Sequence, residues 1–132
     1  MTTDGLTRIA SAFGANETMD RLEAAVSAKG MTVFARIDHA AGAAEAGLPL
    51  RPTQVLIFGN AKGGTPLMQD AQTAGLDLPL RALAWEDADG RVWLTATDAH
   101  ALAARHGLGQ ASAAAVEALA AGVDRQLRAA VA

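Results

Sequence analysis

The residues best suited to chemistry lie at the ends of predicted elements. His39 follows the alternating run from Met31 to Ile37, which predicts a strand, and it stands next to Asp38 at the start of a short alanine-rich segment. In that position His39 could act as a general base, or as an axial or metal ligand facing a cleft. The alternative is structural, because an imidazole at a strand end can equally well bond a loop carbonyl.

A second group lies in the glycine-rich segment from Gly59 to Thr65. A phosphate-binding P-loop requires a glycine, four further residues and then Gly-Lys-Ser/Thr. Gly59 and Gly64 have this separation, but Thr65 follows Gly64 directly and Lys62 lies inside the loop. Nucleotide hydrolysis is therefore not predicted. Backbone amides at a helix start, together with Lys62, could still hold a small anion. The alternative is a turn that needs glycine for its backbone angles, with Asn60 bonding its own loop.

The other ionisable residues do not form a recognisable catalytic set. His100 and His106 are six residues apart and do not share a helix face as the two histidines of HExxH do. Glu86, Asp87 and Asp89 gather at a predicted hairpin tip, where solvated acids are common. No serine stands in a Gly-x-Ser-x-Gly elbow. We predict no preformed metal centre and no catalytic carboxylate pair.

Three large side chains could line a pocket. These are Met68, Trp85 and Trp93, but thioether and aromatic groups on such elements usually fill a core. We expect at least two of the three to be core residues.

Composition limits the class of protein. The chain has 132 residues, 51% of them hydrophobic, a net charge of −3 and no cysteine. The length predicts a single domain, residues 1–132. The lack of cysteine excludes disulfide scaffolds and thiolate metal sites. The mild acidity is unfavourable for nucleic-acid binding. No apolar run reaches the length needed to cross a bilayer, and no signal peptide is visible, so we expect a cytoplasmic protein without a membrane partner.

Hydrophobic periodicity and turn residues predict the elements that position these groups. Asn16 is expected to cap the first helix, and Thr65-Pro66 to begin a later one. The turn at residues 87–90 predicts a hairpin. The expected strands are 6–13, 31–37, 53–58, 80–86 and 91–97, and the expected helices are 16–30, 39–46, one from 65 onward, 99–106 and 110–131.

Several strings resemble one known family. They are Phe34-Ala35-Arg36-Ile37-Asp38-His39, the segment 58–68, Leu76-Asp77-Leu78-Pro79-Leu80, Trp85-Glu86-Asp87 with Gly90-Arg91-Val92-Trp93, and Arg105-His106-Gly107-Leu108. Together they are similar to the domain-of-unknown-function 302 (DUF302) family. The resemblance implies a single α+β domain in β-α-β4-α order, with a mainly antiparallel curved sheet and helices packed on one face. It also implies a commonly dimeric protein of no settled activity or cofactor. Family members commonly carry proline where this chain has Ala61, so a looser loop is expected.

Three functional hypotheses follow. The first is a homodimer that binds a small ligand or anion, with His39, Asn60, Lys62 and Thr65 brought together at one rim of the sheet. The second is an enzyme in which His39 is the general base and Asn60 or Thr65 orients a substrate oxygen. The third is a structural or regulatory interaction module, supported by a narrow apolar stripe on the terminal helix at Val116, Leu119, Val123 and Leu127, which suits helix packing within or between chains. The alternative is that this helix packs on its own sheet.

Overall fold

Five strands form one antiparallel sheet. The computed structural model describes residues 4–132, and its strand order is β1-β5-β4-β3-β2, with every neighbouring pair antiparallel. This confirms the predicted α+β class. The strands are β1 (Leu6–Ser11), β2 (Thr32–Asp38), β3 (Thr53–Gly59), β4 (Leu80–Glu86) and β5 (Val92–Thr97). The predicted hairpin joins β4 to β5, and Gly90 supplies its positive φ of 82°.

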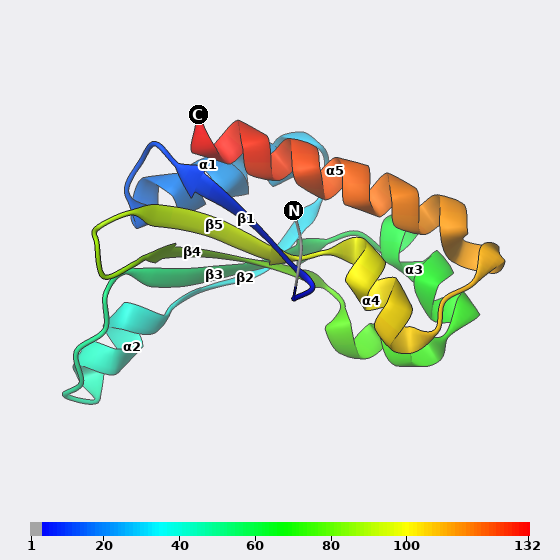
Figure 1. Ribbon diagram of the computed structural model, residues 1–132, viewed down its shortest axis with the longest axis horizontal. Coiled ribbons are helices and arrows are strands. Elements are labelled where there is room, and N and C mark those ends of the chain that lie inside the picture. Colours follow the sequence, from blue (N-terminus) through cyan, green and yellow to red (C-terminus); the bar gives the residue numbers. More distant parts are fainter. Residues whose placement is uncertain (1–3) are drawn as a thin grey trace.

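Two helices cover one face of this sheet. Helix α1 (Ala15–Ala28) and helix α5 (Ala113–Val131) lie side by side on it (Figure 1). Alternate strand residues point toward them and form the larger core with the apolar sides of both helices. Its fully buried members include Met19, Leu22, Leu56, Phe58 and Leu127.

A second, smaller core closes one end of the sheet. It is formed by α3 (Ala61–Asp70), the 3₁₀ segment η1 (Gln72–Asp77), α4 (Ala99–His106) and the first half of α5, which the 3₁₀ segment η2 (Gln110–Ser112) precedes. Its buried residues are Leu67, Ala74, Ala99, Leu102 and Val116. Leu78 and Leu119 contact both cores and join them.

Helix α2 (His39–Glu45) lies at the opposite end of the sheet. It begins where the sequence predicts, and the Asp38 carboxylate accepts a hydrogen bond of 2.9 Å from the Ala41 amide. No residue of α2 is buried, and the helix projects on the side of the sheet away from α1 and α5 (Figure 1).

The stripe on the terminal helix packs within its own chain. Val116, Val123 and Leu127 are buried in the two cores, and Leu119 is partly buried against both. The stripe is therefore not free to contact a partner, and the hypothesis that it forms an interaction surface is wrong. No helix in the part of the chain described by the structure combines the length and the apolarity that a membrane crossing requires.

Several predicted boundaries are wrong for local reasons. Helix α1 begins at Ala15 after Gly14, so Asn16 is not its cap; its side-chain oxygen instead accepts hydrogen bonds from Gln54 and Arg36. The first strand ends at residue 11, and residues 110–112 form a 3₁₀ turn before α5. A 3₁₀ segment also occupies residues 72–77, for which no helix was predicted.

Candidate functional site

The predicted meeting of His39 with Asn60 does not occur. Strand β2 runs antiparallel to β3, and Asp38 pairs with Gln54 while Thr32 pairs with Gly59. His39 therefore lies at the end where β3 begins, whereas Asn60 lies where β3 ends. With about 3.3 Å per strand residue, the six residues from Gln54 to Asn60 span about 20 Å. His39 is exposed there as the first residue of α2, and it cannot share a site with the glycine-rich segment.

Asn60, Lys62 and Thr65 do share one element, but it begins earlier than predicted. The Asn60 side-chain oxygen accepts a hydrogen bond of 2.6 Å from the Gly63 amide and caps α3. The expected glycine turn is therefore the first turn of the helix, and Pro66 lies inside the helix rather than at its start. Lys62 and Thr65 are exposed on α3.

A pocket opens beside this helix start. Its volume is about 220 Å³, and of the four predicted site residues it contacts Asn60 alone. Strand β2 contributes Phe34, which a register shift between Val33 and Ala35 leaves 57% exposed. Most of the wall is apolar, and α5 closes it through Leu119. The lining residues are Met31, Phe34, Gly59, Asn60, Ala61, Gly63, Gly64, Met68, Leu78, Pro79, Leu80 and Leu119.

Glycine shapes the side of the pocket formed by α3. A Cβ atom added at Gly64 would lie 3.5 Å from the Leu78 side chain, so a longer side chain there would enter the pocket. A Cβ atom at Gly63 would lie 3.0 Å from the Asn60 side-chain oxygen and press on the cap. The glycines therefore keep the pocket open and allow the cap to form.

The polar character of the pocket is confined to one end. The first amides of a helix have no intrahelical partner, and here they belong to Ala61 and Lys62. The helix dipole favours negative charge at this end. Lys62 lies in the first turn of α3 and is exposed, but it is not one of the residues that line the pocket. The arrangement can accept an apolar body against the methionine and leucine side chains, with a hydrogen-bond acceptor or an anionic group toward α3.

A polar cluster fastens β2, which carries part of the pocket wall, to α1. The Arg36 guanidinium donates to Gln54 at 3.0 Å, to Asp20 at 2.7 Å, to Glu23 at 3.2 Å and to the Asn16 side chain at 3.1 Å. Arg36 faces α1 because its partner Leu56 also points to that side of the sheet. Sequence reasoning missed this cluster, since its members are scattered over residues 16–54.

A second cluster joins η1 to α4. His106, whose side chain is only 6% exposed, lies between the Asp77 carboxylate at 2.6 Å and the Thr73 hydroxyl at 3.1 Å. The hydrogen bond with His106 holds the pKa of Asp77 below its usual range, and the charge of Arg105 adds to this effect. Nothing in the sequence links residues 77 and 106, which lie 29 positions apart. The cluster is not part of the pocket wall.

The remaining candidates lie elsewhere. Met68 lines the pocket, while Trp85 and Trp93 lie on the face of the sheet away from α1 and α5, so the expectation that at least two of the three fill the core is wrong. His100 bonds the Glu117 carboxylate at 2.8 Å, and this bond raises the pKa of His100 above its ordinary value of 6.5. Within residues 4–132, no three histidine or carboxylate side chains gather as a metal site would require.

Comparisons with known proteins place this fold. The family described as "Domain of unknown function DUF302" matches residues 7–131. The crystal structure of an uncharacterized conserved DUF302 protein from Bacillus stearothermophilus superposes with a TM-score of 0.76, covering 98% of this chain and 97% of that one at 19% identity. That likeness shows the fold alone.

Curated relatives come from Brucella. A protein of Brucella suis biovar 1 (strain 1330) named "Fluoride-specific ion channel FluC 1" is 53% identical over 118 residues, which cover 89% of this chain and 46% of that protein. A protein of Brucella melitensis biotype 1 named "Fluoride-specific ion channel FluC 2" is equally similar over 44% of its length. The chain thus spans less than half of these relatives. The match over residues 7–131 shows that the chain belongs to the DUF302 family.

Proposed function

We propose that this DUF302 domain is a ligand-binding module whose ligand is a small, mainly apolar molecule with an anionic or hydrogen-bond-accepting end. The observation that carries the proposal is the pocket of about 220 Å³ at the start of α3. Its wall is built from Met31, Met68, Leu78 and Leu119, and its polar end is the start of a capped helix.

The size of the pocket limits the ligand. Drug-sized ligands occupy pockets of roughly 300–1,000 Å³, so a smaller pocket suits a fragment-sized molecule. Burial of its apolar part would supply most of the affinity, at roughly 25 cal/mol per Å² of apolar surface removed from water. The helix amides and Lys62 would determine how the ligand is oriented in the pocket, whereas the pocket volume limits the size of the ligand.

The geometry does not favour the enzyme hypothesis. A general base must lie within hydrogen-bond reach of the group that it deprotonates. His39 and the pocket are separated by the length of β3, so His39 could not serve a substrate bound beside Asn60. Among residues 4–132, no histidine lines the pocket.

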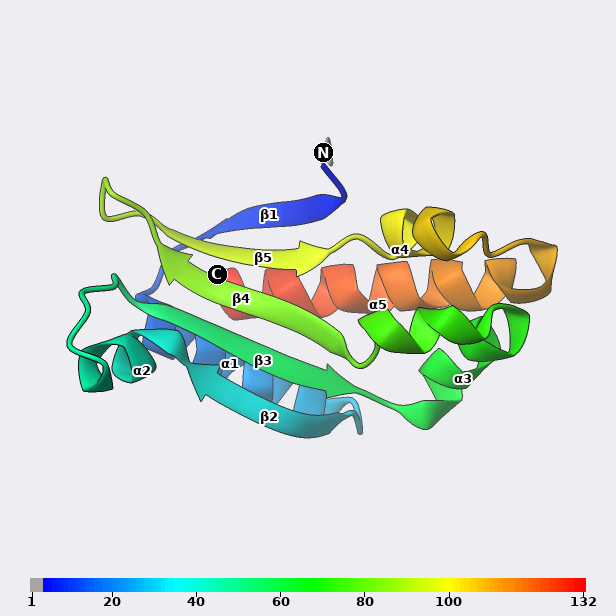
Figure 2. The ribbon, with the colours of Figure 1, turned by 90° about the horizontal axis from the view of Figure 1, so that it is seen from below.

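The names of the Brucella relatives suggest fluoride as a ligand, but the pocket favours a different one. Fluoride is strongly hydrated and needs several donors to replace its water, whereas most of the wall here is apolar. We therefore assign ion conduction only to the longer proteins that carry that name. We also propose that this ligand-binding domain acts in the cytoplasm and as a homodimer. The homodimer is supported by the sheet face opposite α1 and α5, which neither long helix covers (Figure 2).

The test is a titration of the purified chain followed by calorimetry and by NMR chemical-shift changes. The probes are straight-chain carboxylates of roughly four to ten carbons, the matching alcohols, sodium fluoride and inorganic phosphate. We expect affinity to rise with chain length until the pocket is full, and carboxylates to bind more tightly than alcohols. We expect the resonances of Met68 and Leu119 to shift.

Two variants and one control sharpen the test. Gly64→Met should fill the pocket and abolish binding, whereas Ala121→Met, on the exposed side of α5, should leave it unchanged. Lys62→Ala should lower the affinity for carboxylates by about twofold to fivefold and leave the affinity for alcohols unchanged. Binding that is unaffected by Gly64→Met, or a panel in which no carboxylate or alcohol binds, would refute the proposal.

A further inference from the structure

Three polar side chains meet around one imidazole ring where η1 contacts α4. Thr73 and Asp77 belong to η1, and His106 is the last residue of α4. The Nε2 atom of His106 lies 2.6 Å from the Asp77 carboxylate, and its Nδ1 atom lies 3.1 Å from the Thr73 hydroxyl. Both distances fall within the range of about 2.6–3.2 Å that joins a nucleophile to its base and the base to the group that orients it.

The Asp77 carboxylate determines which ring nitrogen of neutral His106 carries the proton. An ionised carboxylate can only accept hydrogen bonds, so Nε2 must donate to it. The hydrogen bond from His106 and the charge of Arg105 hold the pKa of Asp77 below its usual range, which keeps this carboxyl group ionised. Nδ1 of the neutral ring then has only a lone pair, and the Thr73 hydroxyl must donate to it. In this arrangement a histidine can take the proton of a hydroxyl nucleophile.

Burial differs between the base and the hydroxyl group. The His106 side chain is only 6% exposed and the Asp77 side chain is 23% exposed, so bulk water has little access to the bond between them. Thr73 is an exposed residue, so a reactant can reach its oxygen from solvent. The bond between Asp77 and His106 is sufficient to tie η1 to α4. The hydroxyl group on the other ring nitrogen adds a nucleophile to this pair.

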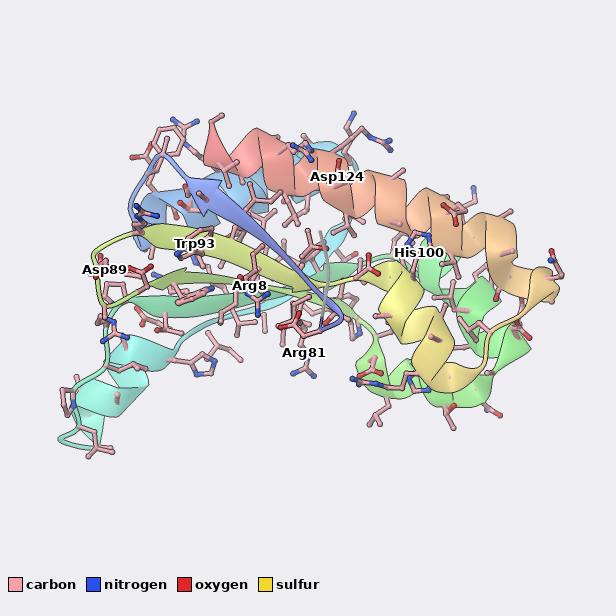
Figure 3. All side chains as sticks on the ribbon, in the orientation of Figure 1. Arg8, Arg81, Asp89, Trp93, His100 and Asp124 are labelled. Carbon is pink, nitrogen blue, oxygen red and sulfur yellow. The ribbon has the colours of Figure 1, made fainter. Side chains whose placement is uncertain are left out.

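The other histidine of α4 shows what distinguishes this cluster. His100 bonds the Glu117 carboxylate at 2.8 Å and lies 3.7 Å from the Asp98 carboxylate. Figure 3 shows His100 at the start of α4, next to α5. Within residues 4–132, neither ring nitrogen of His100 bonds a hydroxyl group. A pair of histidine and carboxylate therefore occurs at both ends of α4, but the nucleophile is present only at the C-terminal end.

We propose that Thr73, His106 and Asp77 form a site that transfers an acyl group from an activated ester or thioester to the Thr73 oxygen and then to water. Thr73 is the nucleophile and His106 is the general base. Asp77 is a positioning residue, because it fixes the tautomer and the orientation of the ring. This activity goes beyond the proposed ligand binding, since the site does not include His39 and lies outside the wall of the pocket beside α3.

The reaction has two balanced steps. In the first step the Thr73 oxygen attacks the acyl carbon, and its proton moves to Nδ1 of His106. The bond from the acyl carbon to the leaving oxygen or sulfur breaks, and Nδ1 gives the proton to the leaving alcohol or thiol. In the second step water gives a proton to Nδ1 and attacks the same carbon. The bond to Thr73 breaks, the Thr73 oxygen takes the proton back, and a carboxylic acid is released while Asp77 stays ionised.

The surroundings of Thr73 indicate which acyl groups would react. Thr73 does not line the pocket beside α3, so the apolar wall of that pocket does not hold an acyl chain at this site. A general base typically contributes about 10²–10⁴-fold to a rate. This contribution suits substrates that already have a good leaving group. We therefore expect short acyl groups on thiols or phenols to react, rather than amides or long-chain alkyl esters.

The first test labels the full chain with a fluorophosphonate, which forms a P–O bond with an activated hydroxyl group and releases fluoride and a proton. Peptide mass spectrometry compares Thr73 with Thr32, an exposed threonine that no histidine bonds within residues 4–132. We expect Thr73 to react about 100-fold faster than Thr32. The rate should rise with pH as His106 changes from imidazolium to imidazole. Asp77 and Arg105 are the charged groups beside this ring.

Variants that keep Thr73 identify the base and the positioning residue. His106→Gln retains an amide that can donate to Asp77 but has no basic nitrogen, so it should slow the labelling of Thr73 by about 100-fold. Asp77→Asn should slow it by at least about tenfold, because the amide can stabilise the wrong tautomer of the ring. Thr73→Ser should still be labelled. His100→Gln removes the other histidine–carboxylate pair of α4 and is the matched control, which should leave the rate unchanged. Circular dichroism and thermal unfolding show whether each variant is folded.

Hydrolysis of p-nitrophenyl acetate measures the complete reaction. The wild-type chain should release nitrophenolate in a burst and then turn over steadily, as expected for a covalent intermediate. Thr73→Val has nearly the same shape but lacks the hydroxyl group. It should show only the slow reaction of the ester with solvent and with the amino groups of the chain.

The proposal fails on any of three results. Thr73 of the folded wild-type chain is labelled no faster than Thr32, or folded His106→Gln is labelled as fast as the wild type, or Thr73→Val hydrolyses the ester as fast as the wild type. The first result needs no variant, so it does not depend on whether a substitution disturbs the fold. None of the three bears on the ligand-binding proposal, because ligand titration reports on the pocket beside α3.

Discussion

Removing the Arg36 guanidinium tests whether the polar cluster holds β2 against α1. We consider Arg36→Met, which keeps the apolar stem and deletes the charged group. The side chain of Arg36 is 25% exposed, and its partner Gln54 is a buried residue with 7% exposure. Because β2 carries Phe34 and follows Met31, the substitution also tests how the pocket wall is supported.

The expected loss has two parts. Two ion pairs, to the half-exposed carboxylates Asp20 and Glu23, contribute about 0.3–1 kcal/mol each after screening by solvent. The Gln54 side-chain oxygen then lacks its donor while its amide still bonds Asn16, which costs about 1–2 kcal/mol. Relief of the partly desolvated guanidinium offsets part of this. We expect a loss of about 2 kcal/mol in the free energy of unfolding, or about 8 °C in Tm for a domain of this size.

Urea unfolding followed by circular dichroism measures the loss, and two further variants interpret it. Arg128→Met removes an exposed i,i+4 pair with Asp124 and should cost no more than about 0.5 kcal/mol. Arg36→Met combined with Gln54→Leu removes the orphaned amide and should recover about 1 kcal/mol. The reasoning is refuted if Arg36→Met costs no more than Arg128→Met, or if the double variant is less stable than the single one.

Three more predictions concern the ends of helices. Asn60→Ala should lower the free energy of unfolding by about 1 kcal/mol, measured in urea, because the Gly63 amide loses its cap. Glu117→Gln should return the pKa of His100 toward 6.5 in an NMR titration; in the wild type the raised pKa stabilises the fold below pH 6.5, and this contribution is lost as pH rises through the folded-state pKa. The lowered pKa of Asp77 contributes stability above its ordinary value of 3.8 that is lost as pH falls through the folded-state value, so Asp77→Asn should flatten the acid limb of a Tm-against-pH curve. An unchanged curve would show that the bond to His106 does not stabilise the fold.

Local patterns predicted most of the fold. Hydrophobic patterns identified all five strands, residues 53–58 as a continuous apolar run rather than by alternation, and turn chemistry at residues 87–90 identified the hairpin. Both signals depend on neighbours in sequence. The start of α3 was misplaced for the same reason. A proline after a threonine is a common helix start, but here the side chain of Asn60 captures the Gly63 amide five residues before Thr65, and the glycines become helical.

The site was predictable only where it depended on one element. Asn60 was found because a polar residue at a strand end is a local signal, and it does line the pocket. His39 was misplaced because its position relative to Asn60 depends on the pairing direction of β2 and β3, which neither residue reveals. The Arg36 and His106 clusters join residues up to 38 and 33 positions apart and exist only in the folded chain.

The pocket lies at the seam between the two cores, since its lining residues Leu78 and Leu119 belong to both. A partly empty seam allows the end built from α3, η1 and α4 to open while the sheet and α1 stay folded. Occupation of the seam would then make the two cores unfold as one unit. Amide hydrogen exchange would detect this change. With ligand bound, slow exchange should extend from Leu56 in the larger core to Leu67 and Leu102 in the smaller core. The cooperativity of unfolding would then report whether the ligand is bound.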